Sequence, residues 1–112
     1  MLSLKNSLAV LRKTNALLDG HFVLSSGLHS PSYVQCAKLL SFPNKSEKFT
    51  KSLAIKIKKT FKNIDLILSP AIGGIVVGYE IGRVLKKETI FCERVDGKFK
   101  LRRGFNIKKN SR

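Results

Sequence analysis

The sequence predicts an α/β fold in which helices flank a parallel sheet. A short apolar run, Ile64–Pro70, fits a buried strand, and a glycine-spaced apolar helix follows it to about Leu85. A second apolar strand, Thr89–Val95, comes directly after that helix. Two strands joined through a helix pair in parallel, and both are apolar because helices cover the sheet.

The N-terminal part predicts a helix and a hairpin. Leucines at helical spacing indicate an amphipathic helix over about residues 3–18, which we expect to end at Asp19-Gly20. His21–Leu24 reads as a strand, Ser25–Pro31 as a polar turn, and residues 32–40 as a second extended segment. Together they predict an antiparallel hairpin with a long loop.

A second amphipathic helix is expected to begin at Phe42–Asn44. One face carries an apolar residue at every fourth position, namely Phe49, Leu53, Ile57 and Phe61. The remaining faces carry lysines, namely Lys48, Lys51, Lys56, Lys58, Lys59 and Lys62. Such a lysine face is usually solvated and says little about partners.

Composition limits the class of protein. The 112 residues suit one small domain or part of a larger one, and their net charge of +15 favours polyanionic ligands. No apolar run approaches the roughly 20 residues of a membrane helix. The first helix lacks a basic leader and a cleavage site, so we expect no signal peptide. A cytoplasmic protein without a membrane partner is predicted.

The cysteines and histidines do not predict a metal site. Cys36 and Cys92 lie far apart in apolar runs, so we expect buried, reduced thiols. His21 and His29 fall in polar turns, and no Cys/His spacing typical of metal ligands is present. We therefore assign no metal-ligating residues.

Gly73 and Gly74 stand where the strand at Ile64–Pro70 meets the following helix. A helix N-terminus presents free backbone N–H groups and the positive end of the helix dipole. Glycines there allow an anion to approach the backbone. The same residues could simply turn a corner, and a glycine pair alone leaves both readings open.

Two further segments could bind ligands. The turn "SSGLHSP" offers hydroxyl groups beside Tyr33, which suits a flat polar ring or a solvated turn equally. Asp96-Gly97 predicts a tight hairpin flanked by alternating apolar residues. On it, Lys98, Lys100 and Arg102 share a face by strand alternation. These cations could neutralise a polyphosphate, contact nucleic acid or keep the hairpin soluble.

Three stretches together resemble bacterial orotate phosphoribosyltransferase. They are "GHFVLSSGLHSPSYVQCAKLL", "LSPAIGGIVVGYEIGRVL" and "IFCERVDGKFKLRRGF", in the family's order and spacing, over about residues 16–105. The resemblance implies a type I phosphoribosyltransferase fold. It also implies transfer from phosphoribosyl pyrophosphate to orotate in pyrimidine (UMP) biosynthesis, giving orotidine monophosphate and pyrophosphate. Mg²⁺ would assist, in a homodimer whose loop covers the other subunit's site.

The resemblance also implies site residues. An orotate hood would use Ser25, Ser26, Gly27, Ser30, Pro31 and Tyr33. The pyrophosphate would lie on the turn formed by Ala71, Ile72, Gly73 and Gly74. The catalytic loop would hold Arg94, Lys98 and Lys100. Well-studied members carry lysine at the positions of Gly73 and Ser25; the subfamily with "PAIGG" and "ERVDGK" shares both differences.

The family's phosphoribosyl pyrophosphate motif contains two adjacent acidic residues, and no two of the seven acidic residues here are adjacent. We therefore expect an incomplete type I fold truncated before this motif, with a central strand absent, and a chain inactive alone. Residues 1–112 would form one partial domain, with an orotate hood over about 16–42 and the N-terminal part of the α/β core over about 43–112.

A polyanion-binding fragment and the product of a degraded gene are the alternatives. Nucleic acid is disfavoured because few aromatic residues lie among the lysines.

Overall fold

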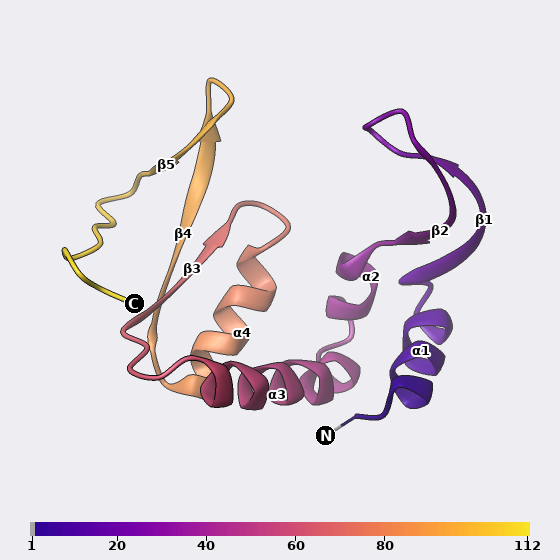
Figure 1. Cartoon of the computed structure of the whole chain (residues 1–112), viewed down its shortest axis with the longest axis horizontal. Coiled ribbons are helices and arrows are strands. Elements are labelled where there is room, and N and C mark those ends of the chain that lie inside the picture. Colours follow the sequence, from indigo (N-terminus) through magenta and orange to yellow (C-terminus); the bar gives the residue numbers. More distant parts are fainter. Residues whose placement is uncertain (1) are drawn as a thin grey trace. The chain divides into compact units, whose positions relative to one another are not determined.

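The computed structural model describes residues 2–112 (Figure 1). The chain divides into two compact units, Met1–Phe49 and Thr50–Arg112. The first contains α1, β1, β2 and α2, the second contains β3, α4, β4 and β5, and α3 spans the boundary. Their bounds are α1 (Leu4–Lys13), β1 (Leu17–Val23), β2 (His29–Val34), α2 (Cys36–Leu40), α3 (Pro43–Thr60), β3 (Leu66–Pro70), α4 (Ile75–Leu85), β4 (Glu88–Val95) and β5 (Lys98–Leu101). The expectation of one partial domain stays a prediction.

Helix α1 is shorter than predicted. Asn15 adopts a left-handed backbone conformation (φ 58°), and its N–H donates to the carbonyl of Arg12 at 3.0 Å. The Ala16 N–H donates to the carbonyl of Leu11 at 2.9 Å. These two bonds form a Schellman cap, which ends a helix by satisfying its last carbonyls. The chain from Leu17 is therefore free to enter β1, instead of continuing the helix to residue 18.

Strands β1 and β2 form the predicted antiparallel hairpin. The register pairs Leu17 with Val34 and Val23 with His29, with an irregularity between Asp19 and Phe22. The segment after β2 is helical, which corrects the prediction of an extended chain to residue 40. The reason is Gln35. Its backbone N–H donates to the carbonyl of Ala16, which is the last bond of the hairpin, and its side-chain oxygen accepts from the N–H of Ala37 and so caps the start of α2.

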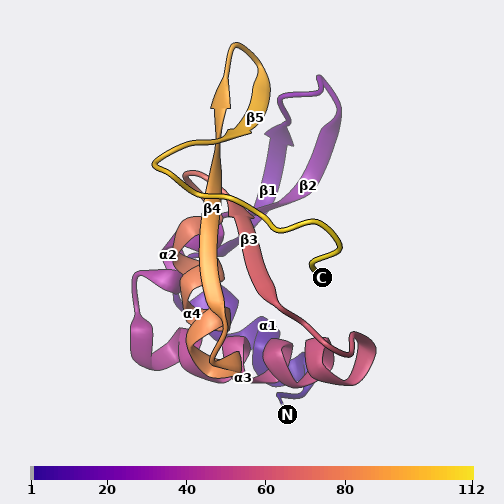
Figure 2. The same ribbon diagram turned by 90° about the vertical axis from the view of Figure 1, so that its left-hand side faces the viewer.

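The second unit contains a three-stranded mixed sheet in the order β3-β4-β5. Strands β3 and β4 are parallel, from Leu66 opposite Glu88 to Pro70 opposite Cys92, as predicted. Strand β4 continues past the end of β3 and pairs with β5 in the antiparallel hairpin predicted at Asp96-Gly97 (Figure 2). The α/β class with a parallel pair, an N-terminal antiparallel hairpin and a basic hairpin is thus confirmed.

Helix α4 packs closely on β3 and β4. A Cβ atom added at Gly78 would lie 2.7 Å from the Cβ of Ser69, and one added at Gly82 would lie 2.9 Å from the Cβ of Thr89. Gly78 and Gly82 therefore let the helix backbone approach the sheet. The core beneath is small: Ala54, Ile81 and Leu85 are buried, with Ile57, Ile64, Ile67, Val77 and Val84 packed around them.

Two expectations about side-chain burial need correction. Cys36 is exposed and Cys92 half-buried; both are free thiols, as predicted, but Cys36 lies in the short helix α2 and not in a covered strand. On α3, Ala54 is buried, whereas Leu53 and Phe61 of the predicted apolar face are 43% and 62% exposed. Among residues 2–112, no helix combines the length and the apolar character needed to cross a bilayer.

Candidate functional site

The turn between β3 and α4 presents two free backbone donors. The Ala71 N–H donates to the carbonyl of Cys92 at 2.7 Å, and the Gly74 N–H donates to the carbonyl of Pro70 at 2.9 Å. Between them, the N–H groups of Ile72 and Gly73 have no acceptor among residues 2–112. Because these donors lie at the N-terminus of an 11-residue helix, the dipole of α4 adds a favourable field for an anion.

The two glycines of this turn have different roles. A Cβ atom at Gly74 would lie 2.6 Å from the carbonyl oxygen and 2.7 Å from the Cδ of Pro70, so close packing requires glycine there. A Cβ atom at Gly73 would meet nothing within 4 Å. Gly73 is therefore dispensable for packing, and its lack of a side chain leaves the open donors accessible to a ligand.

The hairpin of β4 and β5 separates the basic residues that the resemblance assigned to catalysis. Its register places Lys98 opposite Val95 and Lys100 opposite Glu93, whereas Arg94 lies opposite Phe99. Cross-strand partners share a face and successive residues alternate. Lys98 and Lys100 thus occupy one exposed face. Arg94 occupies the other, where its guanidinium lies 4.7 Å from the centroid of the Phe99 ring.

The turn and the hairpin occupy the same edge of the sheet. Pro70, the last residue of β3, pairs with Cys92, and the Ala71 N–H donates to that same residue. The antiparallel hairpin extends from this point, beyond the carboxyl end of β3 (Figure 2). In open α/β sheets, ligands bind outside the carboxyl ends of the parallel strands. The open N–H donors and the hairpin that carries the two exposed lysines therefore both lie at the carboxyl edge of the sheet.

An ion pair at the base of the hairpin was not foreseen from the sequence. Arg103 Nε lies 3.1 Å from Glu93 Oε2, and its terminal nitrogen lies 3.1 Å from Oε1. The same guanidinium lies 5.6 Å from the centroid of the Phe91 ring, which packs edge-on against Phe105. The hydrogen bond from Arg103 lowers the pKa of Glu93 despite opposing desolvation, and Glu93 in turn raises the pKa of Arg103. The pair fixes the chain as it leaves β5.

Replacing Arg103 by alanine should raise the pKa of Glu93 toward its ordinary value, measured by NMR titration of the carboxyl group. Because the folded pKa is depressed, the contribution of this pair to stability is present above the ordinary carboxyl pKa and is lost as the pH falls through the folded pKa. Arg102→Ala is the matched control and should have a smaller effect, since Arg102 acts only through space. Equal shifts in both variants would contradict a role for the hydrogen bond.

The predicted hood residues lie in the β1–β2 hairpin. Gly27 has a left-handed backbone (φ +84°), which the tight turn requires, and Ser26 Oγ accepts from the N–H of Leu28 at 3.3 Å. Ser30 Oγ donates to the carbonyl of Ser32 at 2.7 Å. The ring of Tyr33 packs against Phe22, with centroids 5.6 Å apart. Ser25 lies exposed at the same turn. Polar groups of the hood thus partly satisfy one another.

The described residues contain no cluster of side chains that could hold Mg²⁺ by itself. Among residues 2–112, no group of three or more His, Cys, Asp or Glu side chains could hold a metal ion. Mg²⁺ prefers oxygen ligands in octahedral geometry. Glu93, which lies opposite Lys100 in the hairpin, is already held by Arg103. We therefore derive no chemical step through a metal bound by this chain.

Comparison with solved structures places the fold in the type I phosphoribosyltransferase class. The crystal structure of orotate phosphoribosyltransferase from Aeropyrum pernix matches with a TM-score of 0.66 and 25% identity, covering 89% of this chain and 53% of that chain. Coverage of about half of the neighbour agrees with an incomplete fold.

Sequence comparison defines the relationship further. The orotate phosphoribosyltransferase of Helicobacter pylori is 50% identical over 104 residues, covering 93% of this chain and 52% of the relative. The orotate phosphoribosyltransferase of Erythrobacter litoralis is 48% identical over 101 residues, which cover 89% of this chain and 52% of the relative. No family model matches the chain. The chain is thus a relative of the orotate phosphoribosyltransferases over about nine-tenths of its own length, and it spans about half the length of the curated relatives it matches.

Proposed function

We propose that this chain is an orotate phosphoribosyltransferase-like protein that grips the pyrophosphate of phosphoribosyl pyrophosphate, and that these 112 residues do not complete the transfer alone. The observation that carries the proposal is the open pair of N–H donors at Ile72 and Gly73, at the edge of the sheet from which the lysine-bearing β4–β5 hairpin extends. The identity of about 50% to enzymes of this name supports the choice of substrate.

The reaction would replace the pyrophosphate on the ribose with a ring nitrogen of orotate. Negative charge builds up on the departing pyrophosphate, so fixed donors placed at its oxygens lower the barrier. The backbone donors would hold the pyrophosphate in position. Lys98 and Lys100 would neutralise the charge that develops as the bond breaks. Arg94, on the opposite face and stacked on Phe99, would position the hairpin instead of contacting the same oxygens.

The other parts of the proposal depend on the relatives. The hood at Ser25–Gly27, with Ser30 and Tyr33, would hold the flat orotate ring. Any Mg²⁺ would arrive bound to the substrate, since the described residues supply no site for it. A cytoplasmic homodimer is the expected form. The ribose and its 5-phosphate would need residues that this chain does not provide, because its acidic residues are all isolated in the sequence.

Gly73→Val should remove binding of phosphoribosyl pyrophosphate, supplied as its magnesium complex and followed by titration calorimetry. The valine side chain would cover the two donors without disturbing the packing, since open space surrounds this position. Loss of hydrogen bonds to a charged group should cost about 2 kcal/mol or more. Ile72→Ala is the matched control: the side chain is 86% exposed, and the variant keeps the backbone N–H. Unchanged affinity in Gly73→Val would refute the assigned role of the turn.

A further inference from the structure

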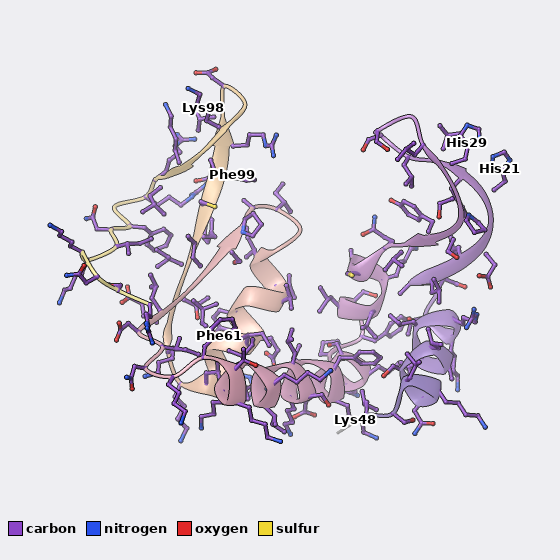
Figure 3. The ribbon with its side chains drawn as sticks, in the orientation of Figure 1. His21, His29, Lys48, Phe61, Lys98 and Phe99 are labelled. Atoms are coloured by element: carbon purple, nitrogen blue, oxygen red, sulfur yellow. The ribbon has the colours of Figure 1, made fainter. Side chains whose placement is uncertain are left out.

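Two exposed imidazole rings meet on the β1–β2 hairpin. His21 Nε2 lies 2.6 Å from His29 Nδ1, and the ring centroids are 4.8 Å apart. Figure 3 shows the two rings side by side, on neighbouring strands. His29 pairs with Val23 at one end of the ladder, and His21 lies in the irregular stretch before Phe22. The hairpin therefore holds both rings at one place on its surface.

We propose that His21 and His29 form a two-histidine site for a late first-row divalent metal ion, with Cu²⁺ preferred over Ni²⁺ and Zn²⁺. Neutral imidazole suits these ions, and affinities for a given nitrogen site rise to Cu²⁺ before falling at Zn²⁺. Mg²⁺ and Ca²⁺ prefer oxygen ligands and are not expected to bind there. The site rests on the histidine geometry alone and is independent of the proposed transferase function.

The distance between the facing nitrogens suits a shared ion after a small adjustment. Metal–imidazole bonds are about 2.0–2.1 Å long, so two such bonds at right angles separate the nitrogens by about 2.9 Å. The observed separation of 2.6 Å has to widen by a few tenths of an ångström, and both rings have to turn, because the centroid separation of 4.8 Å leaves the two nitrogens pointing at each other and not at a common ion. Both histidines are exposed, so side-chain rotation can supply this change without moving the strands.

The protonation change required for binding is simple. Without metal, one imidazole donates its N–H to the facing nitrogen of the other. For both facing nitrogens to bind an ion, the donor ring moves that proton through solvent to its second nitrogen. No net proton leaves the neutral pair, and two lone pairs then face the ion. Water would complete the coordination.

The charge distribution of the sequence also favours a cation at this position. The chain carries 22 Lys and Arg residues, yet none lies between Lys13 and Lys38. Asp19 is the one acidic residue in that interval, and its carboxylate pairs with Arg12 at 3.3 Å. The hairpin is therefore a segment without cationic side chains in a protein of net charge +15. The hairpin itself therefore adds no cationic side chain that would repel a metal ion, and in salt the charges close to the site dominate.

Binding would have a mechanical consequence. His21 and His29 stand on the two strands that lead into and out of the turn containing Ser25 and Ser26. An ion held by both rings would link the strands on either side of that turn. Since an ion that binds the folded hairpin stabilises it by mass action, the fold should melt at a higher temperature in the presence of the metal.

The test is a calorimetric titration of the untagged chain with Cu²⁺, in a Cys36→Ser background because the exposed thiol of Cys36 could itself react with the ion. We expect one ion per chain. His21→Ala and His29→Ala should each lower the affinity at least about tenfold, since either change removes one of only two protein ligands. The double variant should lose little more than either single variant, because the two rings act as one unit.

Two further measurements make the outcome decisive. Val23→Ala, an exposed neighbour of His29 in the ladder, is the matched control and should bind Cu²⁺ as the parent does. In NMR spectra, Zn²⁺ should shift the ring signals of both histidines together. Absence of saturable binding, or binding retained in both histidine variants, would overturn the proposal. Because neither histidine belongs to the pyrophosphate turn, these results do not depend on the Gly73→Val experiment.

Discussion

Gly82→Val should lower the free energy of unfolding by about 3 kcal/mol, the upper part of the range for overpacking a tight contact. A Cβ atom at this position would lie 2.9 Å from the Cβ of Thr89 and closer still to its hydroxyl oxygen. The Thr89 Cβ belongs to strand β4 and cannot rotate away, so α4 would have to move off the sheet. The core that such a shift would open contains only three buried side chains, Ala54, Ile81 and Leu85.

The experiment needs a control for the intrinsic helix propensity of valine. Tyr79→Val places the same residue in the same helix at a position that is 67% exposed, and it should change the unfolding free energy by less than about 0.5 kcal/mol. Urea unfolding followed by circular dichroism compares the two variants. Similar stabilities for both would mean that the close contact of Gly82 with β4 does not limit the packing.

In the second unit, local signals in the sequence were sufficient to predict a strand, a helix and a hairpin turn. The apolar strand before Pro70, the glycine-spaced helix and the Asp96-Gly97 turn are each determined by residues near one another in the chain, and all three form as predicted. The first unit shows the limit of the same reasoning. Asp19-Gly20 predicts a later helix end, but Asn15 ends α1 earlier through a left-handed cap, and Asn is itself a known signal for that position.

The glycine turn connects β3 to α4, at the strand-to-helix junction that the sequence predicts, and its role as a binding site stays a prediction. The separation of Arg94 from Lys98 could have been derived, because a two-residue turn at Asp96-Gly97 pairs Arg94 with Phe99. The ion pair of Glu93 with Arg103 could not have been derived from the sequence, since the two residues lie ten positions apart with no periodic pattern connecting them.

Strand β3 lies at the edge of its sheet beside an apolar groove. The groove has a volume of about 850 Å³ and is lined by α3, β3 and α4. Leu68 on β3 is 47% exposed, and Phe61 at the end of α3 (Figure 3) is 62% exposed. An edge strand beside exposed apolar side chains readily pairs with further polypeptide. The chain spans about half the length of the relatives it matches, and β3 is the edge along which further strands could pair.

The 112 residues alone should consume no orotate in the presence of Mg²⁺ and phosphoribosyl pyrophosphate, even at high protein concentration. Adding the part of the Helicobacter pylori relative that this chain does not match should restore turnover, because ribose-binding residues would then be supplied. In the restored enzyme, Lys98→Ala should slow transfer on the order of a hundredfold, the scale expected for losing one group that stabilises developing charge.

The lysine variants separate catalysis from simple attraction of a polyanion. If Lys98 acts on the charge that develops during transfer, its loss lowers the rate more than it weakens substrate binding. Lys48→Ala removes one positive charge from α3 and, as the matched control, should leave both quantities unchanged. Equal losses of rate and binding in Lys98→Ala would mean that Lys98 attracts the substrate and does not stabilise the charge that develops during transfer. Turnover by the 112 residues alone would show that ribose can be held without adjacent acidic residues, and the proposal that these residues do not complete the transfer alone would be wrong.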